Sequence, residues 1–314
     1  MFFSISNSCN CFYTCVRMSD ASIPMVQAAT APALRAASAP PVDQATALAK
    51  EQRLSDILRG LDSVLIAFSG GADSAYLAWA AHTVLADRAL AITALSASFS
   101  RHDREQAEAF VRASGLRHEF IETREFENPL YIANNADRCY HCKDELFDRM
   151  QALANERNFK FIAYGINTDD THDFRPGHRA AHEHRVLAPL LEAALTKTEI
   201  RWLSQRAGLA TWDRPASACL SSRVPYGTAV TPELMDKIDR AEAVLRELGF
   251  RQFRVRAHGE LARIELALDE LSVGLQPIIS QKIAAGVKEA GFAIVTLDLE
   301  GYRQGSLNSL LKVK

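Results

Sequence analysis

The stretch that decides the fold is residues 63–81, SVLIAFSGGADSAYLAWAA. A short run of branched apolar residues, Val64 to Ile66, leads into two consecutive glycines, and an apolar segment of helical character begins near Ser74. Adjacent glycines let the backbone turn sharply and approach a ligand, while the first N–H groups of the next helix point into the turn. The pattern therefore predicts a strand, a tight loop that can hold an anion, and a helix.

The six residues at 69–74, Ser-Gly-Gly-Ala-Asp-Ser, are neither a Walker A loop, which has a lysine after the glycines, nor G-x-G-x-x-G. They resemble the pyrophosphate loop (PP-loop) of ATP pyrophosphatases, which cleave ATP between the α and β phosphates. A simple strand-to-helix turn with a satisfied N-cap is the alternative. The resemblance implies that amides and hydroxyls hold the departing pyrophosphate, that Asp73 helps to place Mg²⁺, and that ATP binds Ser69, Gly70, Gly71, Asp73 and Ser74.

The composition, 48% hydrophobic and 24% charged, is typical of a soluble globular protein, and 314 residues can form two domains. A net charge of −2 argues against a broad nucleic-acid-binding surface. No apolar run approaches the ~20 residues that span a bilayer. We therefore expect a protein that binds neither nucleic acid nor membranes.

The first 44 residues differ from the rest. They lack the basic start and the uninterrupted apolar run of a secretory signal, and their second half is rich in Ala, Pro and Ser. We expect a disordered extension over residues 1–44 and a cytoplasmic protein. Cys9, Cys11 and Cys15 fall in this extension, which could not preorganise metal ligands.

Beyond residue 44, expected strands alternate with helices of ten to fifteen residues. The strands are expected at 64–66, 90–97, 116–122 and 159–164, and the helices at 45–61, 103–113 and 139–157. Such alternation indicates an α/β fold with a parallel sheet, whose ligands bind at the carboxyl ends of the strands. We expect this nucleotide domain to span residues 45–229.

Two later segments have no regular period. Residues 172–184 hold four histidines and are expected to form a loop over the active site or a solvated surface loop. Residues 212–228, which include Cys219, are interrupted by prolines and Gly227, and long irregular loops are often functional. A helix at 196–207 separates the two segments.

From residue 230 the pattern changes. A helix is expected at 231–248, strands at 253–257, 262–268 and 293–299, and another helix at 271–285. We expect a small α+β domain over residues 230–314, packed behind the nucleotide domain.

Cys139 and Cys142 lie three positions apart near a helix start, so their sulfur atoms can face the same way. Cys219, about eighty positions later, could approach them only through the fold. Three explanations stay open: a structural zinc with a fourth ligand such as His141, a three-cysteine [4Fe–4S] cluster, or a redox pair with Cys219 as a separate nucleophile. The remaining alternative is three unrelated buried thiols.

Several motifs together resemble the LarE-type ATP-dependent sulfur transferases of the PP-loop superfamily, over roughly residues 45–300. The motifs are SGGADS at 69–74, RCYHCK at 138–143, GINTDD at 165–170, and ACLSSR at 218–223 followed by PYGT at 225–228. NAD synthetases, GMP synthetases and tRNA thiolases share only the loop motif. The combination with the Cys219 motif is much more specific.

The resemblance implies sulfur insertion into the precursor of the nickel-pincer nucleotide of lactate racemase. ATP would adenylate a carboxylate of pyridinium-3,5-biscarboxylic acid mononucleotide, and sulfur would then displace AMP to leave a thiocarboxylate. Adenylation is needed because a carboxylate is a poor electrophile, and the charge on the phosphates calls for Mg²⁺ and fixed N–H donors. Relatives form homo-oligomers, so we expect the same here.

The family has two sulfur sources: a cysteine that matches Cys219 and becomes dehydroalanine, or a [4Fe–4S] cluster that carries an extra sulfide. All three cysteines are present, which favours the cluster, with Cys139, Cys142 and Cys219 as its ligands.

The anionic substrate also calls for a cationic pocket. Arg254 and Arg256 alternate on a strand and so share a face, although they could equally form a charged strand edge. The expected substrate-binding residues are His141, Lys143, Ser222, Arg223, Arg254 and Arg256.

Other functions stay possible. A PP-loop amidating synthetase would not need three cysteines, and a tRNA thiolase would be expected to carry a basic bias that a pI of about 6.5 does not provide. A non-catalytic sensor of adenine nucleotides is an alternative of another class.

Overall fold

A computed structural model describes residues 42–172, 176–215, 218–303 and 305 of the protein. The extension predicted at residues 1–44 lies outside these ranges except for its last three residues, and so do Cys9, Cys11 and Cys15. The described residues form one compact unit. A domain boundary near residue 230 therefore stays a prediction.

A four-stranded parallel sheet forms the centre of the N-terminal half of the described chain, in the order β3-β2-β1-β4. Its strands are β1 (Val64–Ala67), β2 (Ala89–Leu95), β3 (His118–Glu122) and β4 (Phe161–Tyr164). The strand order reverses beside β1, and such a switch point is where open α/β sheets bind ligands. The predicted α/β class with a parallel sheet is confirmed.

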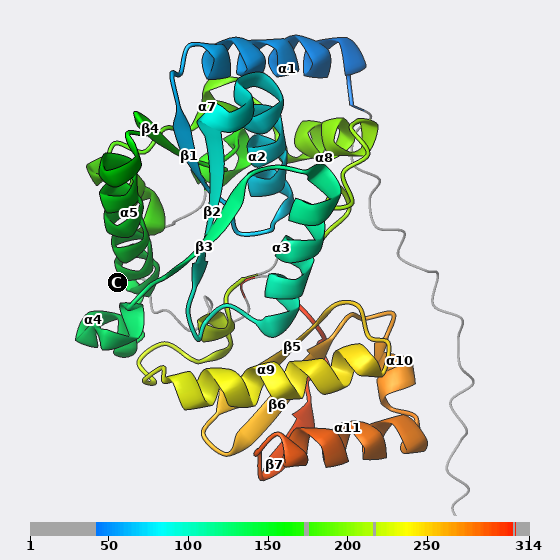
Figure 1. The fold of residues 1–314 in the computed structure, drawn as a ribbon. Coiled ribbons are helices and arrows are strands. Elements are labelled where there is room, and N and C mark those ends of the chain that lie inside the picture. Colours follow the sequence, from blue (N-terminus) through cyan, green and yellow to red (C-terminus); the bar gives the residue numbers. More distant parts are fainter. Residues whose placement is uncertain (1–41, 173–175, 216–217, 304, 306–314) are drawn as a thin grey trace, which may run out of the picture. The chain divides into compact units, whose positions relative to one another are not determined.

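Helices cover both faces of this sheet (Figure 1). Val64 and Ile66 pack in one apolar cluster and Leu65 and Ala67 in another, because successive side chains of a strand point to opposite faces. The first face carries α1 (Gln44–Arg59), α2 (Ala72–Leu85), α3 (Arg101–Ser114) and α8 (Lys197–Arg206). The second carries α5 (Arg138–Arg157) and α6 (Pro176–Glu183).

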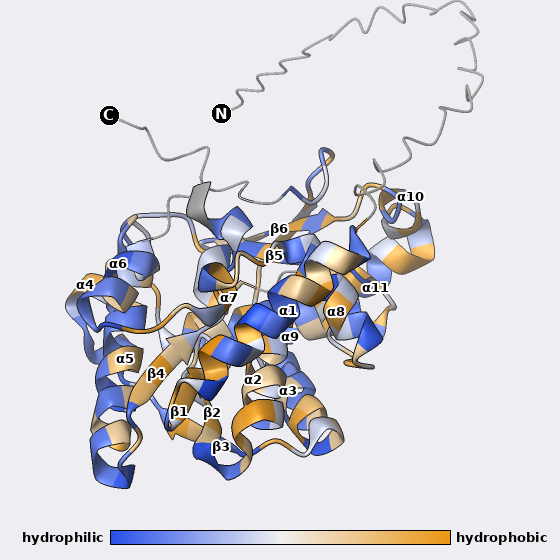
Figure 2. Cartoon of the chain, turned by 90° about the horizontal axis from the view of Figure 1, so that it is seen from above, coloured by the Kyte–Doolittle hydropathy of each residue, from blue (hydrophilic) through white to orange (hydrophobic). Residues whose placement is uncertain are grey.

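Hydropathy follows these layers. Figure 2 shows hydrophobic residues concentrated on β1, β2 and β4, whereas hydrophilic residues are frequent on the outer helices α1 and α5. Strands that are buried on both faces need apolar side chains on both, as in a covered parallel sheet. None of the helices within the described ranges is long and apolar enough to cross a bilayer.

One expectation about local structure is wrong. The histidine-rich segment at 172–184 is largely helix α6, because Ala180 and Ala181 are buried against the second face of the sheet and form an apolar stripe too short to give a visible period. A further short helix, α4 (Pro129–Ile132), precedes α5 and is capped by Asn128. Leu187 forms an isolated bridge to Ala163 just before α7 (Pro189–Glu192).

Short 3₁₀ helices occupy several connections. They are η1 (Ala86–Arg88), η2 (Glu125–Glu127), η3 (Thr168–His172) and η4 (Leu220–Arg223).

A second sheet, in the order β5-β6-β7, forms the rest of the chain. Its strands are β5 (Phe253–His258), β6 (Leu261–Leu266) and β7 (Ile294–Leu297), accompanied by α9 (Pro232–Glu247), α10 (Leu271–Gly274) and α11 (Pro277–Glu289). One face of the sheet packs on α9 and α11 in a single apolar cluster.

We expected this second sheet to lie behind the first one, but it does not. Arg101, which follows β2 at the start of α3, donates from Nε to Oδ2 of Asp239 on α9 (2.7 Å). α9 therefore lies at the carboxyl-end edge, the edge of the parallel sheet where Phe68, Ser96, Thr123 and Gly165 follow its strands. The second sheet can thus contribute to a site at that edge.

Gly165 lets β4 end directly against α2. A Cβ atom at this position would lie 2.8 Å from the backbone nitrogen and 2.9 Å from the Cα of Ser74. Backbone atoms cannot move aside as a flexible side chain can, so only glycine fits here without displacing the first turn of α2.

We expect Gly165→Ala to lower the free energy of unfolding by about 1–3 kcal/mol, because the added methyl group overpacks this contact. Gly60→Ala is the matched control, since Gly60 has a helical φ of −70° at the end of α1, and it should change stability by less than about 1 kcal/mol. Urea unfolding measures both. Equal stability of Gly165→Ala and the wild type would show that the contact is looser than described.

Candidate active site

The glycine loop, residues 69–74, is closed by its own hydroxyl groups. The Ser69 nitrogen donates to Ser74 Oγ (3.2 Å), the two serine hydroxyls lie 3.1 Å apart, and Ser74 Oγ donates to the Gly71 carbonyl (3.1 Å). Gly70 has a φ of +75°, a conformation that favours glycine. Gly71 is the N-cap of α2 and offers no side-chain acceptor, so the first N–H groups of α2 lack a side-chain cap. An anion can take that place.

Asp73 is held by a lysine from another helix. Lys197 Nζ forms an ion pair with Asp73 Oδ2, while Asp73 Oδ1 is buried and accepts no hydrogen bond within the described part of the chain. Lys197 is the first residue of α8, whose start is fixed by a capping box between Thr196 and Glu199.

Arg214 contacts the glycine loop from the irregular segment before Cys219. It donates from Nη1 to the Gly70 carbonyl (2.8 Å) and from Nη2 to Oδ1 of Asp103 (2.7 Å). Asp103 itself lies in the first turn of α3.

The motif at 165–170 also reaches this edge. The Asn167 side chain is buried, and its Oδ1 accepts from the Asp169 nitrogen (2.9 Å). Asp169 Oδ2 in turn accepts from the backbone nitrogen of Lys197 (2.7 Å). The ends of β1 and β4 and the start of α8 are thereby joined around the glycine loop.

Two segments far apart in sequence are joined beside the C-x-x-C pair. The Arg138 guanidinium, which is 3% exposed, donates from Nη1 to the Ser221 carbonyl (2.8 Å) and also to the Asn134 side chain. Asn134 Nδ2 donates to the carbonyls of Pro225 and Thr228 (2.9 Å each). These bonds place the Cys219 segment, residues 218–223, against the start of α5.

This contact brings the three thiols into one neighbourhood. Burial is the main cause that raises the pKa of Cys142, and negative charge on Glu125, Cys219 or Cys139 would raise it further. All three are free thiols, and Cys139 and Cys219 are exposed. Among the residues that the structure describes, however, no three His, Cys, Asp or Glu side chains are placed to hold a metal ion together.

The other predicted substrate ligands on α5 lie next to these thiols. His141 Nε2 is 3.4 Å from Oδ2 of Asp137, and Lys143 Nζ lies 5.8 Å from the centroid of the Phe147 ring. No substrate contact follows from these distances, so both assignments stay predictions.

Arg223 and Arg256 serve to hold the Cys219 segment. Arg223, 3% exposed, binds both carboxylate oxygens of Glu242 on α9 (2.8 and 2.9 Å) and donates to the Cys219 carbonyl (3.0 Å). Arg256 donates to the Ser222 carbonyl (2.9 Å) and to the buried Glu265 (2.8 Å). Arg254 lies over the Tyr302 ring, with 5.2 Å between Cζ and the centroid. Whether these arginines also bind substrate stays a prediction.

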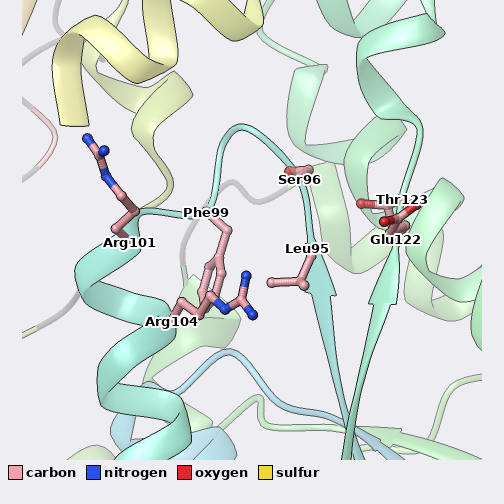
Figure 3. Close-up of a pocket in the computed structure, with 7 residues that line it drawn as sticks. All are labelled: Leu95, Ser96, Phe99, Arg101, Arg104, Glu122 and Thr123. Carbon is pink, nitrogen blue, oxygen red and sulfur yellow. The ribbon is translucent and has the colours of Figure 1, made fainter. Parts of the chain in front are cut away.

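A pocket of about 310 Å³ lies at the same edge, at the ends of β2 and β3 (Figure 3). Phe99 and Arg104 lie side by side in it, Leu95 points toward them, and Arg101 points toward α9. The turn behind the pocket also touches the Cys219 segment, because the Leu220 nitrogen donates to the Ser98 carbonyl (2.9 Å).

Comparison with known proteins decides the family, although no family model matches the chain. An uncharacterized Synechocystis protein is 43% identical over 263 residues, 84% of this chain and 98% of that protein. The pyridinium-3,5-bisthiocarboxylic acid mononucleotide synthase of Lactiplantibacillus plantarum is 34% identical over 269 residues, 85% of this chain and 96% of that enzyme. The chain belongs to the LarE family. An uncharacterized Methanocaldococcus jannaschii protein is 30% identical over 174 residues, 55% of this chain and 66% of that protein.

Sequence reasoning missed two cations of this LarE-family site, Lys197 and Arg214. A signal existed for Lys197, because a lysine in the first turn of a helix faces the positive end of the helix dipole and so calls for an anionic partner. Arg214 offered no such signal, since its partners come from Gly70 and Asp103, more than 110 positions earlier.

The buried pair of Arg223 and Glu242 yields a stability prediction. Burial alone would raise the pKa of Glu242, but the Arg223 guanidinium outweighs it and holds that pKa below its usual 4.5. A carboxylate whose pKa is lower in the folded state than in the unfolded state stabilises the fold at pH values above its unfolded-state pKa. This contribution is lost as the pH falls through the folded-state pKa. Removing the negative charge of Glu242 leaves the Arg223 guanidinium buried without a counter-ion.

We therefore expect Glu242→Gln to cost about 3–5 kcal/mol of unfolding free energy at pH 7, measured in urea. The wild type should lose this advantage over the variant as pH falls below about 4.5. Glu247→Gln, an exposed change on the same helix, is the control and should be nearly neutral. A neutral Glu242→Gln would show that the pair does not hold the Cys219 segment.

Proposed function

We propose that this protein is an ATP-dependent sulfur transferase that converts a carboxylate of pyridinium-3,5-biscarboxylic acid mononucleotide into a thiocarboxylate, for the nickel-pincer cofactor of lactate racemase. The observation that carries the proposal is the match to 96% of the length of an enzyme named for the bisthiocarboxylic product. The glycine loop and the three free thiols, which lie on adjoining segments, support it.

The glycine loop would bind the phosphates of ATP. The uncapped N–H groups at the start of α2 and the Ser69 and Ser74 hydroxyls are suitable donors for pyrophosphate as it leaves. Lys197 would balance part of the negative charge of the pyrophosphate. The substrate carboxylate would attack the α phosphate, pyrophosphate would depart, and the resulting acyl adenylate would carry AMP as a good leaving group.

Asp73 fits a role in binding Mg²⁺. Its Oδ1 is buried and accepts no hydrogen bond from the described residues, and carboxylate oxygen is the donor that this hard cation prefers. When bound, Mg²⁺ would neutralise charge that develops on the phosphates.

The thiols fit a [4Fe–4S] cluster in donor type and number, since Cys139, Cys142 and Cys219 are all free. Their arrangement is not that of a preformed metal site, so binding would require the thiols to draw together. When bound, such a cluster offers an iron without a protein ligand that can carry sulfide. The second candidate source is Cys219 itself, because its thiol is exposed and lies in the segment that Arg138 and Arg223 hold.

Substrate anions would bind between α5 and the second sheet. We assign this role to His141, Lys143, Ser222 and Arg254, with Arg223 and Arg256 close by. Arg223 and Arg256 already hold carbonyls of the Cys219 segment, so they would orient the sulfur donor and the substrate together.

The decisive experiment mixes the protein with Mg²⁺–ATP and pyridinium-3,5-biscarboxylic acid mononucleotide and measures pyrophosphate and thiocarboxylate. We expect substrate-dependent pyrophosphate release, a loss of about 100-fold or more in Asp73→Asn because the phosphate charge is less well neutralised, and no thiocarboxylate from Cys219→Ser. Lys282→Gln, exposed on α11, is the control and should match the wild type. Release that depends on tRNA would identify a thiolase instead, and bound but uncleaved ATP would identify a sensor.

Anaerobic reconstitution with iron and sulfide tests the sulfur source separately. We expect four irons per chain by iron analysis and the broad visible absorption of a [4Fe–4S] cluster, both strongly reduced in Cys139→Ser, Cys142→Ser and Cys219→Ser. A variant with Cys9, Cys11 and Cys15 all changed to Ser should keep the cluster. Colourless protein with one zinc would refute the cluster, and conversion of Cys219 to dehydroalanine after turnover would establish Cys219 as the source.

A further inference from the structure

Arg138 is a buried cation that no described carboxylate neutralises. Its side chain is only 3% exposed, and among the residues that the structure describes it forms no ion pair. The oxygens to which it donates are neutral, namely the Asn134 side-chain oxygen and the Ser221 carbonyl (2.8 Å). A buried charge is costly unless an opposite charge lies beside it. Arg138 therefore points to an anion in its surroundings.

Two other arginines show how this region otherwise neutralises a buried positive charge. Arg223 is 3% exposed and pairs with Glu242 (2.8 Å), and Arg256 is 5% exposed and pairs with Glu265 (2.8 Å). Both also donate to carbonyls of the Cys219 segment, as Arg138 does. Within the described ranges, Arg138 differs from them in having no glutamate partner.

The contact with the Ser221 carbonyl does not by itself require a charged donor. Asn134, a neutral amide, donates to the Pro225 and Thr228 carbonyls of the same later segment (2.9 Å each). A neutral side chain at position 138 could hold a carbonyl in the same way, so the positive charge needs a separate explanation.

The sulfur site provides that explanation. Arg138 Nη2 lies 4.0 Å from Cys139 Sγ, and Nη1 holds the carbonyl two positions after Cys219. The guanidinium therefore lies between the first thiol and the segment that carries the third. Burial lowers the pKa of Arg138, but negative charge on Cys219 and on Cys139 outweighs burial and raises that pKa above its ordinary value.

A sulfur centre at this place would be anionic. Three thiolates bring more negative charge than the oxidised core of a [4Fe–4S] cluster brings positive charge, and a sulfide on the open iron adds more. Glu125 does not offset this charge, because it is itself an acid, and its buried Oε2 accepts no hydrogen bond in the described part of the chain. Lys143 is a cation on the same helix but is partly exposed, so water screens it.

We propose that Arg138 is the fixed counter-ion of the sulfur site, a buried positive charge that stabilises the negative charge of the cysteine-bound sulfur centre. The inference rests on the proposed function in one respect, the binding of a cluster by Cys139, Cys142 and Cys219. Its consequence is that added negative charge, whether an electron or a sulfide, costs less at this centre than it would beside a neutral residue.

A redox titration of the anaerobically reconstituted full-length protein, followed by electron paramagnetic resonance of the reduced cluster, tests the charge. Arg138→Gln keeps a donor for the Ser221 carbonyl but removes the charge. One-electron reduction should then become at least about tenfold less favourable, a shift of about 59 mV to more negative potential. Arg138→Lys keeps the charge, so its reduction equilibrium constant should stay within about threefold of the wild-type value.

Two control variants separate the charge from the structural contact. Asn134→Gly removes the neutral donor at a φ of +54°, which glycine adopts freely, so the protein should unfold at a lower urea concentration but keep the wild-type potential. Arg149→Gln removes a 40%-exposed arginine about 16 Å further along α5, where water screens its charge. It should change neither the potential nor the stability.

An unchanged potential in Arg138→Gln would overturn the inference. An equal shift in Asn134→Gly would also overturn it, because the shift would then come from the loosened contact. If Arg138→Gln holds no cluster, Arg138→Lys decides: four irons with the wild-type potential would support the counter-ion, and loss of the cluster there too would contradict it. A wild type that binds no cluster would refute the cluster as sulfur source together with this inference, whereas pyrophosphate release would still test the rest of the proposed function.

Discussion

The site depends on the buried contact between the start of α5 and residues 221–228. Arg138 and Asn134 supply the donors, and backbone carbonyls of the later segment accept them. Backbone carbonyls in an irregular loop have no hydrogen-bond partners in a strand or helix. Such a loop can therefore be buried only if side chains donate hydrogen bonds to these carbonyls. By supplying those partners, α5 determines where the third thiol lies relative to the first two.

Buried ion pairs complete this arrangement. Arg223 with Glu242, and Arg256 with Glu265, link the Cys219 segment to α9 and to the second sheet. Such pairs add little net stability compared with apolar packing, but they tolerate few alternative geometries, because either charge alone is costly to bury. We interpret them as devices that fix the position of a loop which hydrophobic packing alone would leave free to shift.

The fold was largely predictable from the sequence because its signals are local. The run from Val64 to Ile66, the glycines after it and the alternation of strands and helices each depend on neighbouring residues. The helix α6 was missed because its apolar stripe is too short to produce a period, and the placement of the second sheet was wrong because it depends on long-range pairs such as Arg101 with Asp239. For the site, motif residues could be named in advance, and the position of Lys197 at a helix start was a usable signal. Arg214 becomes visible only through partners distant in sequence.

The position of α9 and the second sheet at the carboxyl-end edge has a consequence for dissecting the protein. In many α/β proteins the half that contains the parallel sheet can be treated as a separate functional domain. Here, cutting the chain at residue 230 would strip Glu242 from Arg223 and remove Arg256 from the Ser222 carbonyl. A fragment that keeps the Cys219 segment in place would therefore have to include both sheets.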